Sequence, residues 1–353
     1  MKIVNVETFP NYNVIIGENL LAECGKHIEQ ITKPCKIAIL TDDKVKSLYA
    51  STVQNSLKTS GFERLIFDFP NGENQKNLKT IENMLEFLAE NEFTRSDLIV
   101  ALGGGVVGDM AGFVAATFLR GIRFVQIPTT LLAMVDSSVG GKTACNLKAG
   151  KNLVGAFYQP KLVLCDTNTL KTLNEEMFAC GLAEAVKTAM IASEELFLLL
   201  EKGESRQNIE QIEKIIENCV KIKASVVAKD EKENGLRQIL NFGHTMAHAI
   251  EKLSDYKIAH GQAVALGMIG ICRSSKEQGI CNAELVERLE KCLKINNLPT
   301  LIPYNADSIF KIATADKKRK GNKLTLVLPK TIGECTLESM ELEKVKTFFE
   351  KAF

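Results

Sequence analysis

The sequence predicts an α/β protein in two parts: a parallel β-sheet covered by helices, followed after about residue 170 by a mainly α-helical part. Three observations support this prediction. Short apolar runs alternate with helically spaced segments in the first half, a glycine-rich turn follows one of these runs, and helical patterns dominate the second half. The expected domains are therefore residues 1–170 and 171–353, each long enough for a core of its own.

The apolar runs of the first half are expected to be buried parallel strands, because each ends at an aspartate, a proline or a glycine. They are residues 36–41, 64–69, 98–102, 124–127 and 161–165. Residues 77–91 carry apolar side chains at helical spacing, from Leu78 through Met84 to Leu88. A helix is also expected after the glycines that follow residue 102.

The second half is expected to be mainly helical. The predicted helices are residues 174–192, 193–202, 207–230, 243–254, 260–278 and 283–295. Two short strands are expected at residues 324–328 and 333–337, before a last helix at 341–352.

Composition excludes several classes of function. The net charge is +1, so no basic face for nucleic acid is expected. No apolar run approaches the ~18 residues of a membrane helix, and the N-terminus does not resemble a signal peptide. The ten cysteines are scattered without a Cys-x-x-Cys pair, which indicates reduced thiols in a cytoplasmic protein.

The segment from Gly103 to Gly108 has the G-x-G-x-x-G pattern between a predicted strand and a predicted helix. Glycines let the backbone approach a pyrophosphate, and the helix N-terminus supplies N–H donors. A Rossmann-like domain is therefore expected, although a turn needed only for packing has the same pattern. The ribose-binding acid usual about 20 residues later is absent, and Asp42 or Asp43 at an earlier strand end are the candidates.

A second glycine pair, Gly140 and Gly141, precedes Lys142 and Thr143, but a P-loop also needs a glycine where Asp136 stands. An ATPase is therefore not expected. The surrounding segment is nevertheless rich in polar residues suited to binding, and its lysines suit a phosphate group. Exposed loop lysines would be the alternative. The polar residues are Thr129, Thr130, Asp136, Ser137, Lys142, Asn146, Lys151 and Asn152.

Three of the four histidines, His244, His248 and His260, fall within 17 residues. Histidine binds divalent metals and transfers protons near neutral pH. Glu184 and Lys187 share one helix face among small apolar residues, which indicates a partly buried carboxylate in need of a partner. Two imidazoles and a carboxylate would make a catalytic zinc site, but the spacing does not decide which two histidines bind. A surface ion pair and ordinary polar histidines are the alternatives.

A group of cations completes the candidate site: Lys223, Arg237, Lys317 and Lys318. Arg237 lies four residues before Asn241, which is one turn if this segment is helical. The alternative for residues 317–320 is a run of charged side chains exposed to solvent without a binding role.

Together these segments resemble the 3-dehydroquinate synthase family of the shikimate pathway over nearly the whole chain. The matching motifs span residues 70–76, 103–109, 120–121, 128–132, 136–142, 150–152, 181–187, 241–245, 260–261 and 316–318. The order and number of these motifs make the resemblance specific.

The resemblance implies an NAD-binding N-terminal domain and a helical domain that binds Zn²⁺, or Co²⁺ in its place. It implies the metal ligands Glu184, His244 and His260, with His248 facing substrate. The implied NAD-binding residues are Asp42, Glu73, Lys76, Gly103, Gly104, Gly105, Val106, Asp109, Thr129, Thr130, Lys142, Lys151, Asn152 and Thr169. The implied substrate and catalytic residues are Asp136, Lys142, Asn152, Lys187, Lys223, Arg237, Asn241, His248 and one of Lys317 or Lys318.

The implied substrate is 3-deoxy-D-arabino-heptulosonate 7-phosphate (DAHP), and the implied assembly is a homodimer in which Arg120 reaches the phosphate bound by the neighbouring subunit. Some positions depart from the family pattern, including Phe118, Ala247 and Gln262, but none removes an implied ligand or catalytic charge. The competing interpretations are another sugar phosphate cyclase, a metal-dependent alcohol dehydrogenase and a non-catalytic protein of the same fold.

Overall fold

The computed structural model describes residues 1–315 and 322–353. This part of the chain divides into two compact units. The first comprises Met1–Leu173 with Lys223–Lys232, and the second comprises Asn174–Ile222 with Glu233–Phe353. Helix α8 (Ile209–Lys229) contributes residues to both units.

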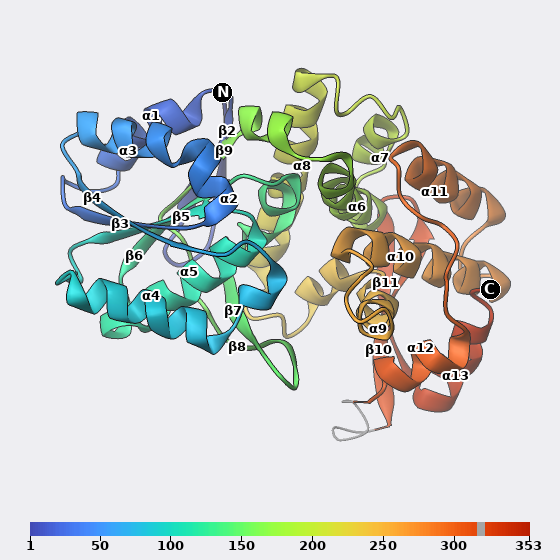
Figure 1. The fold of residues 1–353 in the computed structure, drawn as a ribbon. Helices are drawn as coiled ribbons and strands as arrows, with labels where there is room; N and C mark the ends of the chain where they lie inside the picture. Colours follow the sequence, from blue (N-terminus) through green and yellow to red (C-terminus); the bar gives the residue numbers. More distant parts are fainter. Residues whose placement is uncertain (316–321) are drawn as a thin grey trace. The chain divides into compact units, whose positions relative to one another are not determined.

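A seven-stranded sheet forms the centre of the first unit (Figure 1). The spatial order is β1 (Lys2–Val6), β2 (Tyr12–Gly17), β9 (Leu162–Asp166), β6 (Arg123–Pro128), β5 (Leu98–Gly103), β3 (Lys36–Asp42) and β4 (Glu63–Phe69). Only the edge pair β1–β2 is antiparallel, and all other pairs are parallel. The α/β fold with a largely parallel sheet is confirmed.

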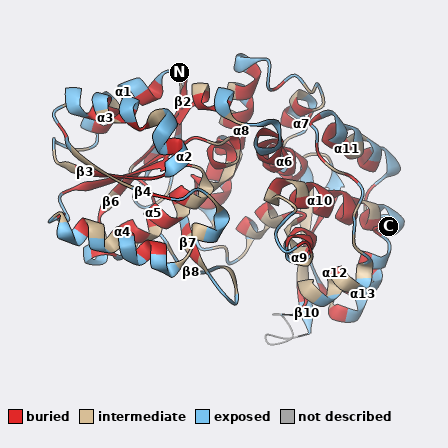
Figure 2. Ribbon diagram, in the orientation of Figure 1, coloured by how far each residue is buried: buried red, intermediate tan, exposed pale blue. Residues whose placement is uncertain are grey.

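Helices cover both faces of this sheet because its central strands are apolar on both sides. On one face, α1 (Leu20–Glu29) and α3 (Ser51–Thr59) pack against one set of alternating strand residues. On the other face, α4 (Leu78–Glu90) and α5 (Gly105–Thr117) pack against the alternate set. Figure 2 shows the buried strands between helices whose outer surfaces are exposed.

Three parallel strands end side by side, which brings the segments after them to one edge of the sheet. Thr41 of β3 pairs with Leu102 of β5, and Gly103 of β5 pairs with Pro128 of β6. The chain runs outward from β3 to β4 and then returns to the opposite side of β3 as β5. Such a reversal of strand order is the usual ligand-binding point of an open α/β sheet.

Two hairpins of the first unit were not expected from the sequence. β1 and β2 extend the sheet at one edge, whereas β7 (Lys142–Leu147) and β8 (Gly150–Phe157) form a separate two-stranded sheet. The latter pair lies in the segment expected to be a binding loop. Its alternation is weak because β8 carries glycine and exposed leucine instead of a buried apolar row.

The second unit is mainly helical, as predicted. Its helices are α6 (Glu175–Ala192), α7 (Glu194–Leu200), the first part of α8, α9 (His244–Leu253), α10 (His260–Glu277), α11 (Ala283–Ile295), α12 (Ala306–Ala313) and α13 (Leu342–Glu350). A hairpin of β10 (Lys323–Thr331) and β11 (Glu334–Glu341) completes the unit. α10 is buried along most of its length and packs against both α6 and α9.

Among the described residues, no helix combines the length and apolar character that a bilayer crossing requires. The ten cysteines all lie in the described part of the chain, and none forms a disulfide.

Candidate functional site

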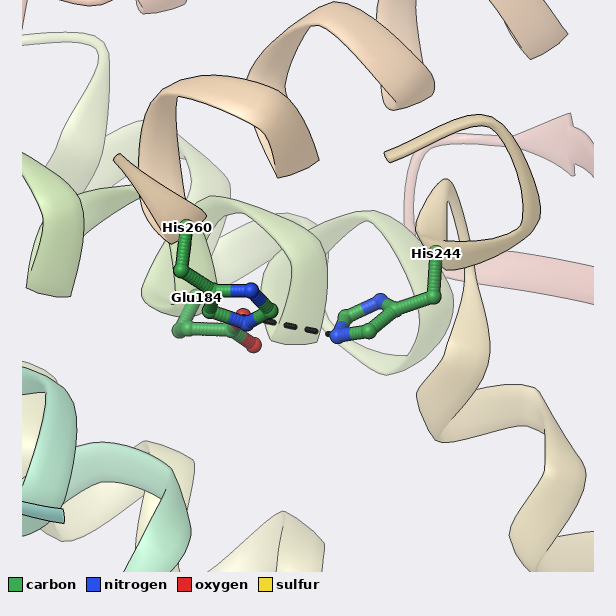
Figure 3. Close-up of side chains that lie close together, drawn as sticks. All are labelled: Glu184, His244 and His260. Carbon is green, nitrogen blue, oxygen red and sulfur yellow. Dashed lines mark ion pairs between the residues drawn. The ribbon is translucent and has the colours of Figure 1, made fainter. Parts of the chain in front are cut away.

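Three helices of the second unit bring Glu184, His244 and His260 together (Figure 3). Glu184 lies in the middle of α6, whereas His244 and His260 are the first residues of α9 and α10. The Nε2 atoms of His244 and His260 are 3.6 and 3.2 Å from Oε1 of Glu184. All three ligand atoms lie within 4.8 Å of one another, so a single cation could contact them all.

Glycines beside the two histidines allow these helices to approach closely. A Cβ on Gly261 would overlap the backbone of Cys180, one turn before Glu184 in α6. Gly243, with a φ of +76°, packs its Cα against Met268 of α10. Only glycine fits these positions, because an added Cβ would meet backbone atoms that cannot move aside. The spacing of the three candidate ligands thus depends on glycines that are not candidate ligands themselves.

Each imidazole has an acceptor beside its second nitrogen. Nδ1 of His244 is 3.1 Å from the carbonyl oxygen of Phe242, and Nδ1 of His260 is 3.4 Å from Oε2 of Glu251. With its single proton on Nδ1, each neutral ring would leave Nε2, the nitrogen that faces Glu184, able to bind a cation. Both rings therefore present Nε2 to the place where a cation could contact Glu184.

The electrostatics of the cluster centre on a buried carboxylate. Glu184 is 0% exposed, and the ammonium group of Lys187 is 2.5 Å from its Oε2. Burial raises the pKa of Glu184, but Lys187 and the two histidines outweigh burial and lower it below its usual range. The alternative of a surface ion pair is thus wrong, because both side chains are buried.

The pKa values of the two candidate ligand histidines are shifted in opposite directions. Burial lowers the pKa of His244 to about 3, and Glu184 only partly offsets this effect. For His260 burial also lowers the pKa, but Glu184 and Glu251 outweigh it and raise the value to about 10. Near neutral pH in the metal-free protein, His260 is therefore a positively charged imidazolium with a proton on each nitrogen. A metal would have to displace one of these protons.

The other candidate residues of the second unit lie on α9 and on η6 (Leu236–Asn241). The ring of His248 is centred 5.5 Å from that of His244 and 6.4 Å from that of His260, but it is outside the ligand cluster. Arg237 is 1% exposed. Asn241 donates from Nδ2 to Oε1 of Glu233 at 2.8 Å.

The first unit holds a second polar network, built around the buried Lys76. Its ammonium group is 2.5 Å from Oδ2 of Asp109 on α5 and 2.6 Å from Oδ1 of Asn152 on β8. Burial raises the pKa of the Asp109 carboxyl, and Lys76 partly offsets this. Asn146 links the network further, since its side chain donates to Glu73 and accepts from the Asn152 backbone, both at 2.8 Å.

The glycine turn lies between β5 and α5 as predicted. No side chain caps the N-terminus of α5, so its first N–H groups are available to an anion. A Cβ on Gly104 would lie 3.1 Å from the Thr130 side chain, and one on Gly105 would lie 3.0 Å from Oγ of Ser137. Glycine here leaves room between the turn and the segment after β6.

Asp42, at the end of β3, is one of the two acids considered for this site. Its Oδ1 accepts a hydrogen bond from the Val45 backbone, which begins α2 (Asp43–Val45). The Asp43 carboxylate instead accepts from the Asn71 backbone. Asp42 is the last residue of β3, next to the strand that leads into the glycine turn. Asp43 contacts the loop after β4 through its hydrogen bond with Asn71. Thr129 donates its N–H to Gly103 O.

The remaining candidates of the first unit are spread over several elements. Asp136 accepts from Lys223 Nζ at 2.5 Å, which joins η4 (Ala133–Ser137) to the end of α8. Lys142 on β7 is exposed and Lys151 on β8 is half-buried. Thr169 is buried and donates to Asp166 O, and Arg120 is exposed with a φ of +67°.

Val106 lies in the first turn of α5, next to the glycines. Lys317 and Lys318 lie outside the described residues. The sequence did not point to Glu251 or Glu233, and it indicated Asn146 only as one of several polar residues suited to binding. Glu251 had a detectable signal, because His244, His248 and Glu251 follow one another at i, i+4 and i+7 on one face of a helix.

A parallel α/β unit with a glycine turn, and a helical unit with a Glu–His–His cluster, place the chain among the sugar phosphate cyclases. Family models agree: residues 66–180 match "3-dehydroquinate synthase N-terminal" and residues 181–319 match "3-dehydroquinate synthase C-terminal". The chain therefore belongs to the 3-dehydroquinate synthase family.

Individual relatives support this assignment. A 3-dehydroquinate synthase of Streptococcus suis is 44% identical over 99% of this chain and 100% of its own length, and that of Streptococcus mutans is 43% identical with the same coverage. A solved 2-deoxy-scyllo-inosose synthase, complexed with carbaglucose-6-phosphate, NAD⁺ and Co²⁺, is 26% identical with a TM-score of 0.89 and covers 100% of both chains.

A 2-epi-5-epi-valiolone synthase of Streptomyces hygroscopicus, with NAD⁺ and Zn²⁺ bound, is 25% identical with a TM-score of 0.88 and covers 97% of this chain and 96% of its own.

Proposed function

We propose that this protein is a 3-dehydroquinate synthase, which converts DAHP to 3-dehydroquinate and phosphate in the second step of the shikimate pathway. The observation that carries the proposal is the meeting of Glu184, His244 and His260 in a chain 44% identical, over its full length, to a 3-dehydroquinate synthase. The reaction joins a transient oxidation, β-elimination of phosphate, reduction, ring opening and an intramolecular aldol step, so its net redox change is zero.

The proposed metal ligands are Glu184, His244 and His260. Their donor set fits Zn²⁺ or Co²⁺, because three protein ligands leave open positions for substrate oxygens, as in catalytic zinc sites. The solved cyclases of the same fold hold Co²⁺ or Zn²⁺ together with NAD⁺. When bound, the metal would acidify the substrate hydroxyl that is oxidised, and NAD⁺ would accept and later return its hydride.

The proposed NAD⁺ site lies on the first unit, at the ends of β3, β5 and β6. The uncapped N-terminus of α5 and the glycine turn suit a pyrophosphate, and Asp42 suits a ribose hydroxyl. Lys76 fixes the Asp109 carboxylate and the Asn152 amide at the same edge. The rest of the proposed set is Glu73, Gly103, Gly104, Gly105, Val106, Thr129, Thr130, Lys142, Lys151 and Thr169.

The proposed substrate residues provide cations for a doubly anionic substrate. Arg237 suits the carboxylate, because a guanidinium pairs with it through two parallel hydrogen bonds. Lys142, one of Lys317 or Lys318, and Arg120 of a second subunit are assigned to the phosphate. Asn152 is assigned to the substrate without a particular group. Arg237 and Lys223 favour DAHP, which carries a carboxylate, over sugar phosphates that lack one.

Several residues would orient hydroxyls or carry protons during the reaction. His248 is exposed, with its ring beside that of His244, and could exchange a proton with a substrate hydroxyl. Asp136 is held by Lys223, and Asn241 is held by Glu233, so each presents a fixed polar group. Lys187 neutralises the ligand Glu184 and could also contact substrate oxygens.

The proposal includes a homodimer and a cytoplasmic location. The exposure of Arg120 suits a cation that serves a neighbouring subunit. Sedimentation of the purified protein would test the assembly. A mixture of Arg120→Ala and His260→Ala chains should regain activity above that of either variant alone, because in a mixed dimer the intact metal site of one chain would receive Arg120 from the other. If Arg120 acted within its own subunit, the mixture would gain nothing.

A phosphate-release assay tests the function. Purified protein is given DAHP and NAD⁺, with and without a chelator, and the carbon product is identified. Phosphate and 3-dehydroquinate should appear in equal amounts without accumulation of NADH, and chelation should abolish both until Zn²⁺ or Co²⁺ is restored. Loaded protein that releases no phosphate from DAHP would refute the proposal, and NADH accumulating from a simple alcohol would instead identify an alcohol dehydrogenase.

A further inference from the structure

The two ligand histidines differ in what holds their second nitrogen. Nδ1 of His244 faces a neutral backbone carbonyl, that of Phe242, at 3.1 Å. Nδ1 of His260 faces the Glu251 carboxylate at 3.4 Å, although Glu251 is 3% exposed. A buried carboxylate needs a charged or hydrogen-bonding partner to offset its lost hydration, so this placement calls for a reason beyond packing.

Glu251 is held in place by the fold. It lies near the end of α9, two turns after His244, while His260 begins α10. The turn between these helices is tied to the same residue, because the Glu251 backbone carbonyl accepts from Ser254 Oγ and from the Tyr256 N–H, both at 2.8 Å. The backbone that carries the Glu251 carboxylate is therefore fixed relative to the start of α10.

We propose that Glu251 is a positioning residue of the metal site: it accepts a hydrogen bond from Nδ1–H of His260, which fixes the tautomer and directs Nε2 toward the metal. A carboxylate behind an imidazole also makes that ring a stronger donor than a carbonyl does. His260 is then the more strongly held of the two histidine ligands. The inference rests on the proposed metal site and extends it by one residue.

Zinc affinity is the first test, measured by competition with a chromophoric chelator. Loss of a carboxylate partner behind a ligand histidine typically lowers metal affinity by about 10–100-fold, and this loss is expected for Glu251→Ala. Glu251→Gln should lose less, because its amide oxygen still accepts from Nδ1–H. The matched control is Glu277→Gln, at the exposed end of α10, which should bind zinc as the wild type does.

A spectroscopic test separates positioning from general destabilisation. The chain has four histidines, so ¹⁵N-histidine labelling gives few ring signals to assign. In the zinc-loaded wild type, His260 should carry its proton on Nδ1 and bind through Nε2. Zinc bound through Nδ1, or a proton on Nε2, would overturn the proposal even if Glu251→Ala failed to fold.

The outcomes distinguish this inference from the proposed function. If the wild-type protein bound no zinc or cobalt, the metal site itself would be wrong. If the wild type bound zinc and folded Glu251→Ala and Glu251→Gln variants bound it equally well, the role of Glu251 alone would be refuted. If Glu251→Gln binds zinc as tightly as the wild type and Glu251→Ala binds it much more weakly, Glu251 acts through its hydrogen-bond acceptor and not through its charge.

Discussion

The Cα of Gly267 in α10 packs against the backbone carbonyl of Gly243, the residue immediately before α9. A Cβ on Gly267 would lie well within 3.0 Å of that carbonyl oxygen. Because the obstacle is backbone, no side-chain rotation could relieve the overlap. This close approach sets the separation of the helices that begin with His244 and His260.

Gly267→Ala is therefore expected to destabilise the protein and to weaken its metal site. Overpacking a core costs about 1–3 kcal/mol, and the backbone obstacle places this substitution at the upper end of that range. Circular dichroism during urea unfolding would measure the loss, since the chain has no tryptophan to report it. Gly150→Ala is the control, because its nearest new neighbour would be a leucine side chain at 3.4 Å. Equal stability of the two variants would contradict the packing argument.

His260→Ala is expected to abolish metal binding and turnover, because it leaves only Glu184 and His244 of the three ligands. Elemental analysis of the purified variant would measure bound metal. His27→Ala is a matched control, since His27 is the fourth histidine and lies on α1 of the first unit. If His260→Ala kept the full metal content, its assignment as a ligand would be wrong.

Lys76→Met is expected to destabilise the first unit and to weaken NAD⁺ binding. It removes the cation within 2.5 Å of the Asp109 carboxylate, whose side chain is only 19% exposed. Breaking such a pair costs about 3 kcal/mol, the lower end for buried pairs, because Asp109 keeps some access to water. The double variant Lys76→Met/Asp109→Asn should recover part of the stability. If urea unfolding showed no recovery of stability in the double variant, Lys76 and Asp109 would not be energetically coupled.

Stability of the metal-free protein should fall as the pH rises above about 6.5, the ordinary histidine pKa. The raised pKa of His260, about 10, means that the folded protein keeps a proton that the unfolded chain releases in this window. The lowered pKa of His244 acts only below that window, where it makes stability fall toward acid pH.

Urea unfolding in the presence of a chelator, from about pH 6.5 to 7.5, would measure this dependence below the range where most thiols ionise. The wild type should lose stability relative to His260→Gln as the pH rises. Parallel pH profiles for the two proteins would contradict the raised pKa of His260.

The parallel strands were predictable because their side chains are apolar on both faces, and strand residues such as Ile37–Leu40 and Leu98–Leu102 carry this pattern without interruption. The hairpin β7–β8 was not predictable, because the residues of β8 alternate poorly and the two strands form a sheet of their own. Likewise, the sequence indicated that Glu184 needed a partner, but the i,i+4 spacing suggested His248 as readily as His260.

The sequence by itself determined the fold class, the glycine turn after β5 and the family, because these depend on local periodicity and on residues close together in the chain. Only the tertiary structure decided that His260, from a different helix, meets Glu184 and His244 while His248 lies outside the cluster. It also decided that Glu251 stands behind His260 and that Lys76 holds Asp109. These relationships depend on how closely helix backbones approach at glycines such as Gly261 and Gly267, which local sequence patterns do not express.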